Sequence, residues 1–338
     1  MERNQKFDFL KGLLMFGVIW GHLITCLLNN EHNDVSIHWM MRTFDMPFFM
    51  LISGYFLAIG MQRKSVKQML LDKVTTILLP TVLWSVLCSM FRAWDMFYFL
   101  WAVFYSSVFM TVCQCFKNEK LRLVAHILVA IAISCVPYTF YNMSYLYPFF
   151  VMGYWYFILV KQHANKFALK LVGGGDFVTT IAVVLYIASL CFWKYDYSIW
   201  NVDGNILNAD TCKFMTIAFR LLIGVVGIYV VKKLADVFFD YMQHHDNWLY
   251  QFILKTGKET MMIYIFQNAL IFQLGIKVVA MISNRLGYNP FSFNHGFLGY
   301  VLAPVFSTLM LYALLVFIRL MKKNKYTSKL FGFKISLK

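Results

Sequence analysis

Three ionisable side chains, Asp8, Lys11 and His22, lie in the apolar stretch that opens the chain. On a helix, at about 100° per residue, they fall within an arc of roughly 60°. An imidazole exchanges protons near neutral pH, and an ammonium group binds anions such as phosphate. Because a charged side chain costs about 2.5–3.5 kcal/mol in hydrocarbon, this stripe predicts a functional surface that faces a cavity.

Plainer interpretations of the same helix stay open. Lys11 can be an anchor at the membrane edge, paired with Asp8, and His22 can be a hydrogen-bonded core residue. Gly17 and Gly21 fall on the opposite side of the helix, where small residues allow close helix packing. Since Asp8 lies too far along the helix axis to orient His22, that imidazole needs a partner from another span.

The second apolar stretch repeats the pattern. Arg42, Asp45, Phe49 and Ser53 fall within an arc of about 80° if this stretch is one helix. Arg42 and Asp45 are three residues apart and can pair as ions. The stretch therefore predicts either functional groups or an ion pair at the outer membrane edge.

Two later stretches carry isolated polar groups. Arg220 lies about two turns inside FMTIAFRLLIG, too deep for easy snorkelling. Thr260, Tyr264 and Gln267 share one stripe of another helix. A structural hydrogen-bonding role and a catalytic role are equal alternatives for this stripe.

The elements that must position these residues are membrane-spanning helices. Of 338 residues, 60% are hydrophobic and only 14% are charged, and the mean hydropathy is +0.61. A soluble protein needs more charge to cover its surface. At about 20 apolar residues per span, we predict an all-α polytopic integral membrane bundle of about ten transmembrane helices, with nine to eleven possible. A single transmembrane domain over residues 1–338, without a soluble extra domain, is expected. The predicted spans are residues 9–28, 39–60, 77–91, 96–115, 123–140, 145–160, 177–193, 214–231, 259–280 and 298–320.

The net charge of +15 follows the expected membrane topology. All but seven of the 31 Lys and Arg residues lie at one set of loops or helix edges, which is the positive-inside pattern. The basic ends MERNQK and RLMKKNKYTSK place both termini in the cytoplasm. Nucleic acid is therefore not an expected partner. The seven cysteines are scattered without metal-ligand spacing, so no metal site is expected.

Motifs along nearly the whole chain resemble membrane-bound acyltransferase family 3. The family's first helix carries an Asp, then Arg or Lys, then ten residues and a His, and this chain reads FDFLK-GLLMFGVIWG-H. The family's second helix has a phrase like fHMPlFFfiSGy, which here is FDMPFFMLISGYFL. Weaker motifs follow in the family's order: LLDKVTTILLP, FYFLWAVFY and TGKETMMIYIF.

Three positions depart from the family pattern. Asp45 stands where a His often precedes Met-Pro, so no role of a second histidine carries over. Thr76 stands where many relatives have an Arg, although Lys73 is kept in the basic link. Gln267 stands where relatives with a sugar acceptor often have His. The chain resembles the stand-alone type of the family.

The resemblance implies a membrane-embedded O-acyltransferase that moves an acyl group, most simply acetyl, from acetyl-CoA to a sugar hydroxyl. Its partners would be acetyl-CoA, a surface polysaccharide or lipid-linked glycan, and the lipid bilayer. Acetyl-CoA is then a co-substrate, no cofactor is bound, and the bacterial inner membrane is the expected location. His22 becomes the general base. The expected donor-binding residues are Lys11, Lys73, Arg63 and Lys64. The expected acceptor or oxyanion residues are Arg42, Asp45, Ser53, Arg220 and Tyr264.

Two other functions are alternatives. A transporter or flippase for a glycan or small anion would use the intramembrane cations as a substrate path, but the inverted repeats common in such proteins are not found. A purely structural subunit does not explain so many intramembrane charges. For an acyltransferase, direct transfer is favoured over an acyl-enzyme, because no activating motif flanks a Ser or Cys. The acceptor sugar and the membrane face of transfer stay open.

Overall fold

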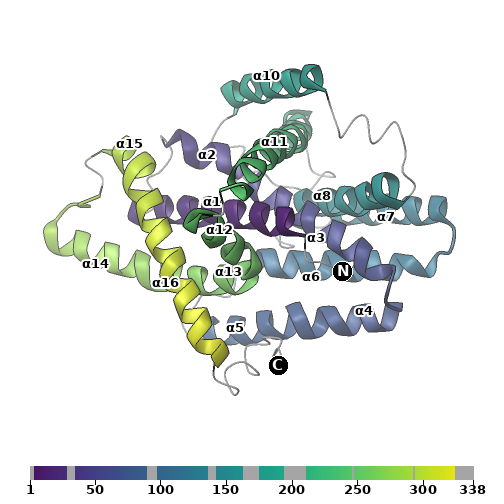
Figure 1. Cartoon of the computed structure of the whole chain (residues 1–338), viewed down its shortest axis with the longest axis horizontal. Helices are drawn as coiled ribbons and strands as arrows, with labels where there is room; N and C mark the ends of the chain where they lie inside the picture. The colour runs from purple at the N-terminus through teal and green to yellow at the C-terminus, as the bar shows by residue number, and fades with distance from the viewer. Residues whose placement is uncertain are drawn as a thin grey trace. The chain divides into compact units, whose positions relative to one another are not determined.

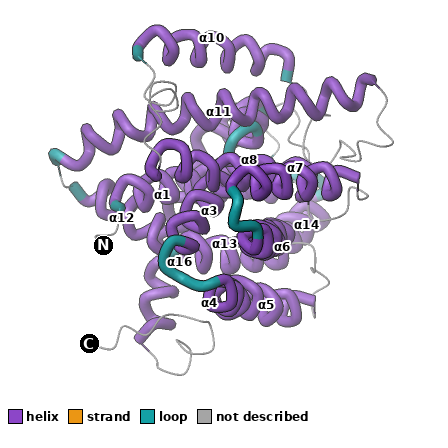
Figure 2. The backbone as a smooth tube through the Cα atoms, turned by 90° about the vertical axis from the view of Figure 1, so that its right-hand side faces the viewer, coloured by secondary structure: helices purple, strands orange, loops and turns teal. Residues whose placement is uncertain are grey.

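The computed structural model confirms the prediction of an all-α bundle. It describes residues 4–28, 35–89, 97–135, 142–162, 175–193, 211–245, 247–291 and 294–323. Across these ranges every regular element is a helix and none is a strand (Figures 1 and 2). The predicted basic ends lie partly outside the described residues.

The chain forms two compact units, which are described separately. The first unit comprises Met1–Asp45, Val82–Phe97 and Lys232–Lys338, and the second comprises Met46–Thr81 and Tyr98–Val231. The expectation of one transmembrane domain stays a prediction.

The first unit is built around α1 (Gln5–Leu27). Its other helices include two segments of π-helix, in which the turns are wider than in an α-helix. They are α2 (Ser36–Arg42), α12 (Trp248–Lys258), α13 (Thr260–Asn268), η7 (Ala269–Gly275, π), α14 (Ile276–Leu286), α15 (His295–Phe297), η8 (Leu298–Leu302, π) and α16 (Ala303–Lys323). Helices α5 (Leu79–Ser89) and α11 (Thr211–Gln243) run across the boundary between the units.

The second unit holds the remaining helices. Helices α7 and α8 lie side by side in it (Figures 1 and 2). The elements are α3 (Asp45–Met61), α4 (Val66–Lys73), η1 (Val74–Leu78, π), α6 (Tyr98–Val112), η3 (Cys113–Cys115, a 3₁₀ turn), α7 (Glu119–Cys135), α8 (Met143–Tyr156), η4 (Phe157–Gln162, π) and α10 (Asp176–Phe192).

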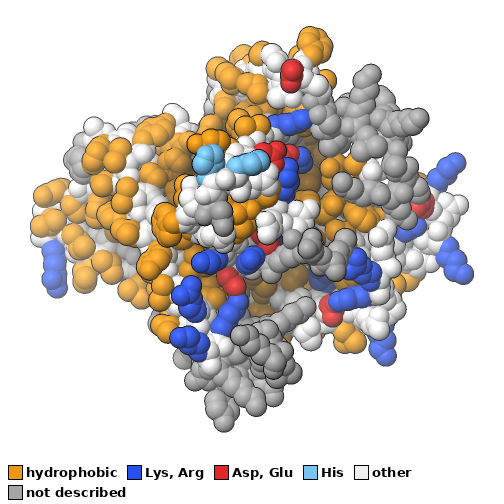
Figure 3. Space-filling view, in the orientation of Figure 1, with side chains coloured by type: hydrophobic (Ala, Val, Ile, Leu, Met, Phe, Trp, Pro, Cys, Tyr) orange, Lys and Arg blue, Asp and Glu red, His pale blue; other side chains and the backbone are white. Residues whose placement is uncertain are grey.

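Eight helical segments within the described ranges are long and apolar enough to cross a membrane. The two other predicted spans are α7 and α10, which are helices of 17 residues each. Many large hydrophobic side chains are exposed, as expected where lipid replaces water as the solvent (Figure 3). The eight segments are Gln5–Leu27, Ser36–Met61, Val66–Val86, Tyr98–Cys115, Met143–Val160, Met215–Gln243, Thr260–Leu286 and His295–Lys323.

The second predicted span is not one continuous helix. Helix α2 ends at Arg42, Thr43 and Phe44 form a turn, and α3 begins at Asp45. Asp45 and Pro47 both suit the first turn of a helix, where a carboxylate meets free N–H groups and proline lacks one. The predicted common face of Arg42 and Ser53 assumed an unbroken helix, and it stays a prediction.

The backbones of α1 and α12 meet almost directly at two glycines. A Cβ atom on Gly257 would lie 1.6 Å from the carbonyl oxygen of Asp8, and one on Gly12 would lie 2.2 Å from that of Ile253. By contrast, Gly17 would meet only the Met41 Sδ atom, at an ordinary 3.5 Å. The expected packing of the Gly17 face is thus a side-chain contact with α2, and the close approach occurs elsewhere.

The second unit contains a similar contact between α3 and α8. A Cβ atom on Gly54 would lie 2.0 Å from the carbonyl oxygen of Phe150, and one on Gly153 would lie 1.9 Å from that of Leu51. Small residues therefore set the helix spacing in both units, as is common in membranes.

We expect Gly257→Ala to lower the apparent melting temperature of the purified protein by about 3–10 °C, because the added methyl group clashes with the α1 backbone. Within a helix, alanine is more favourable than glycine by about 1 kcal/mol. A lower melting temperature of Gly257→Ala would therefore come from the clash. Gly17→Ala in α1 is the matched control and should leave the melting temperature unchanged or slightly raised. Equal melting temperatures for Gly257→Ala and wild type would contradict the close approach.

Candidate functional site

His22 lies buried in α1 and contacts the amide side chain of Gln267 in α13. The His22 Nδ1 atom is 2.9 Å from the Gln267 Oε1 atom, and the two residues are 7% and 0% exposed. The expected partner from another span is therefore Gln267. The sequence places this residue on a polar stripe with Thr260 and Tyr264 but does not link it to His22, because 245 positions separate them.

The hydrogen bonds assign the tautomer of His22. Gln267 donates from Nε2 to the Asn268 Oδ1 atom, at 2.5 Å, so its Oε1 atom is the one that faces the imidazole. An amide oxygen only accepts, and His22 must therefore donate from Nδ1. In a neutral ring the lone pair is then on Nε2, which leaves that atom as the basic one.

Aromatic side chains hold both partners in place. The Phe272 ring stands edge-to-face against the His22 ring, with centroids 4.9 Å apart. Phe266, next to Gln267, makes edge-to-face contacts at 5.0 Å with both Trp84 and Phe317. These rings restrict the rotation of the imidazole and fix the position of α13.

A change of helix type follows the pair directly. Helix α13 ends at Asn268, and the π-helical segment η7 begins at Ala269. Single π-turns inserted in α-helices are frequent at functional sites, because they turn neighbouring side chains to new directions. Tyr264, also predicted as a site residue, is buried one turn earlier in α13.

Asp8 and Lys11 form an ion pair at the other end of α1. The Lys11 Nζ atom is 2.9 Å from the Asp8 Oδ1 atom, and the side chains are 18% and 4% exposed. Helix α12 covers this end at Gly257, and η7 and α13 cover His22. The predicted polar stripe thus packs against other helices, and Lys11 keeps only a small exposed fraction.

Arg42 lies at the end of α2, half-buried and near enough to His22 for the two side chains to interact electrostatically. In the described part of the chain it makes no ion pair with Asp45, which is buried in the first turn of α3. The first unit therefore brings a guanidinium group toward the imidazole, and the ion pair that the sequence allows between Arg42 and Asp45 is not formed among the described residues.

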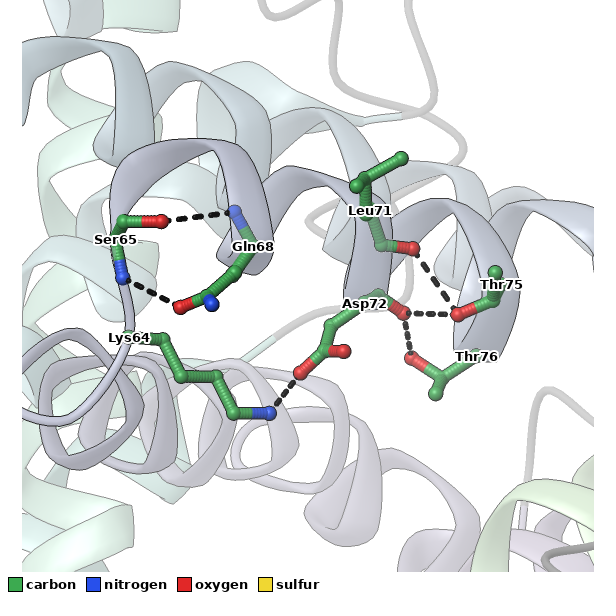
Figure 4. Close-up of polar contacts among 7 residues, drawn as sticks. All are labelled: Lys64, Ser65, Gln68, Leu71, Asp72, Thr75 and Thr76. Atoms are coloured by element: carbon green, nitrogen blue, oxygen red, sulfur yellow. Dashed lines mark hydrogen bonds and ion pairs between the residues drawn. The ribbon is translucent and has the colours of Figure 1, made fainter.

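The predicted donor residues of the second unit lie in α4 or just before it. Lys64 pairs with Asp72, and Ser65 and Gln68 cap the helix reciprocally (Figure 4). Arg63 is exposed beside them, and Lys73 is half-buried on the same helix. This segment thus presents three of the predicted donor cations, and among them Lys64 pairs with the Asp72 carboxylate.

Two further predicted residues of the second unit have local partners. The Ser53 hydroxyl donates to the Phe49 carbonyl oxygen at 2.8 Å, within its own helix. Arg220 is 3% exposed, and its guanidinium lies 4.2 Å from the centre of the Tyr145 ring. A buried guanidinium over an aromatic face is a stabilising arrangement, so neither contact requires a ligand.

Comparisons with known proteins bear on this arrangement. The acyltransferase family 3 model, described as an acyltransferase domain, matches residues 4–319. The nodulation protein NolL of Mesorhizobium japonicum is 23% identical over 297 residues, which cover 79% of this chain and 76% of that protein. The NolL protein of Sinorhizobium fredii is 27% identical over 192 residues, which cover 48% of this chain and 51% of that protein. No solved structure matches significantly.

We expect Asp8→Asn and Lys11→Met each to destabilise the protein by about 3 kcal/mol, because each removes the ion pair and leaves the other charge largely buried. The double variant should recover at least half of that loss, since it removes both charges. Thermal unfolding of the four proteins in one detergent measures this coupling. Strictly additive losses in the double variant would contradict the pairing.

Proposed function

This chain belongs to membrane-bound acyltransferase family 3, and on that premise we propose that it is an O-acetyltransferase with His22 as its general base. It is an integral multi-pass membrane acyltransferase. The proposed donor is acetyl-CoA, and the proposed acceptor is a sugar hydroxyl of a surface polysaccharide or lipid-linked glycan. Family membership does not favour the transporter alternative.

The hydrogen bond between His22 and Gln267 is the observation that supports this role best. A sugar hydroxyl is a weak nucleophile near pH 7, and a positioned imidazole can take its proton during attack. Because Nδ1 donates to Gln267, the Nε2 lone pair is available for that proton. Gln267 and Asn268 then act as positioning residues that keep this tautomer.

The proposed reaction transfers acetyl directly. The sugar oxygen attacks the thioester carbonyl while its proton moves to His22 Nε2, and a tetrahedral oxyanion forms. The C–S bond then breaks, the CoA thiolate leaves, and the imidazolium returns the proton to the sulfur. Arg42, which is near His22 and has a positive charge, is proposed to stabilise the oxyanion.

The cytoplasmic ends of the helices are the proposed donor side. CoA carries phosphate groups, and Lys11 lies on α1 on the cytoplasmic side of His22 in the predicted topology. Arg63, Lys64 and Lys73 add positive charge at α4 in the second unit. The two relatives are bacterial proteins, which supports a place in the bacterial inner membrane.

We expect His22→Gln to lower the transfer rate by about 100-fold or more, because the amide has no basic nitrogen. Membrane vesicles that contain the protein and the cell's own glycans are incubated with labelled acetyl-CoA, and label in the glycan is counted. Thr25→Val is a matched control, since Thr25 is buried one turn away and its hydroxyl donates to the Gly21 carbonyl oxygen of its own helix. Glycan acetylation at the wild-type rate by His22→Gln would refute the base.

Removing the amide of Gln267 tests the positioning role separately. We expect Gln267→Leu to lower kcat by about 10- to 100-fold with little change in KM for acetyl-CoA, because the imidazole keeps its place but loses its fixed tautomer. Steady-state rates of CoA release measure both constants. A change confined to KM would show that Gln267 binds the donor and does not position His22.

A further inference from the structure

A second polar cluster lies in the second unit, where η3, α7 and α8 meet. It consists of Gln114, Arg122, His126, Tyr154 and Trp155, and we refer to it as the Arg122 cluster. None of these residues has a part in the mechanism above. Helix α7 contributes Arg122 and His126, which are four positions apart and so share one face.

Toward the described residues, Arg122 donates from only one of its terminal nitrogens. Its Nη1 atom donates to the Gln114 Oε1 atom at 2.6 Å and to the Tyr154 hydroxyl oxygen at 3.3 Å. Its Nε atom is buried without a hydrogen-bond partner. Among the residues that the structure describes, no carboxylate pairs with Arg122. The Nε–Nη2 edge of a guanidinium can bind a carboxylate or a phosphate through two parallel hydrogen bonds. In Arg122 no described carboxylate binds this edge.

Tyr154 adds a second donor to the cluster. Its hydroxyl oxygen accepts from Gln114 Nε2 at 2.8 Å and from Arg122 Nη1 at 3.3 Å. A phenol also has one proton to donate, and no described residue accepts it. The Gln114 Oε1 atom does not accept the phenol proton, because it faces Arg122 Nη1 and the Gln114 amide points its Nε2 atom at Tyr154.

His126 provides a third donor and is fully buried. Trp155 Nε1, which can only donate, lies 3.1 Å from His126 Nδ1. Nδ1 is therefore the acceptor, and the ring carries its proton on Nε2, which is buried without a partner. The His126 and Tyr154 rings stand edge-to-face, with centroids 5.4 Å apart.

The cluster thus has an excess of donors and a positive charge. A buried donor without an acceptor is destabilising, so a network with only a structural role would be expected to pair its donors. Arg122 also directly follows the first three residues of α7, near the positive end of the helix dipole. An anion with several oxygens would satisfy all of these groups at once.

We propose that the Arg122 cluster binds a phosphate group. Arg122 is half-buried, which leaves its side chain reachable from outside. The phosphate can come from an anionic phospholipid or from CoA. The lipid is favoured, because Leu123 and Ile127, which directly follow Arg122 and His126 on α7, are exposed and would face acyl chains. The inference holds for either source and does not rest on the proposed function.

Thermal unfolding of the purified full-length protein in an uncharged detergent tests this site. The probes are dioctanoyl phosphatidylglycerol, dioctanoylglycerol as the same lipid without phosphate, and CoA. We expect the phosphatidylglycerol to raise the melting temperature and dioctanoylglycerol to have no such effect. Arg122→Gln should raise the half-saturating phosphatidylglycerol concentration about tenfold or more. Lys120→Gln, which removes an exposed charge two positions away, is the matched control and should change it less than about twofold.

The outcomes separate the sources of the phosphate. A loss of CoA stabilisation in Arg122→Gln, with phosphatidylglycerol inactive, would support the phosphate site and assign it to the nucleotide. Equal weakening by Arg122→Gln and Lys120→Gln would overturn the proposal in favour of general attraction to a basic surface. Unchanged binding of both ligands by Arg122→Gln would overturn it as well.

A conservative variant guards against loss of folding. Arg122→Lys keeps the charge but lacks the planar edge, so it should weaken phosphatidylglycerol binding about threefold or more in a folded protein. Binding by Arg122→Lys equal to wild type would contradict the bidentate contact.

Discussion

Helices α1 and α12 approach so closely that the backbone at Gly257 meets the carbonyl oxygen of Asp8, and Gly12 meets that of Ile253. In a bilayer there is little hydrophobic drive to bring two apolar helices together, so close packing at small residues supplies much of the attraction. This contact keeps the ionisable end of α1 away from lipid. The polar residues of α1 are tolerated in the membrane because α12, α13 and η7 cover them.

Covering these residues also fixes their chemistry. A buried polar group must find its partner inside the protein, since lipid offers none. For Asp8 the partner is Lys11, and for His22 it is Gln267, which is itself held by Asn268. The requirement that buried polar groups be paired inside the protein therefore also selects the tautomer of His22. Stability and the proposed catalytic role share these contacts.

Much of the fold follows from local features of the sequence. Long apolar runs give the helices, and the spacing of Asp8, Lys11 and His22 identifies the important face of α1. Other features depend on competition between local signals. The break between α2 and α3 is one example, because Asp45 and Pro47 favour a new helix start over continuation of the apolar run. Hydropathy averaged over a window does not detect this helix break, because the averaging extends across Thr43 and Phe44.

The sequence by itself determined the class of the protein, its family and the residues that cannot face lipid. These depend on composition and on spacings within one helix, where about 100° per residue is enough to place a side chain. Only the tertiary structure decided which residues are partners. Gln267 meets His22 across 245 positions, and Arg122 meets Gln114 and Tyr154 from three different elements. Such pairs depend on how helices pack, and no periodicity along the chain encodes that packing.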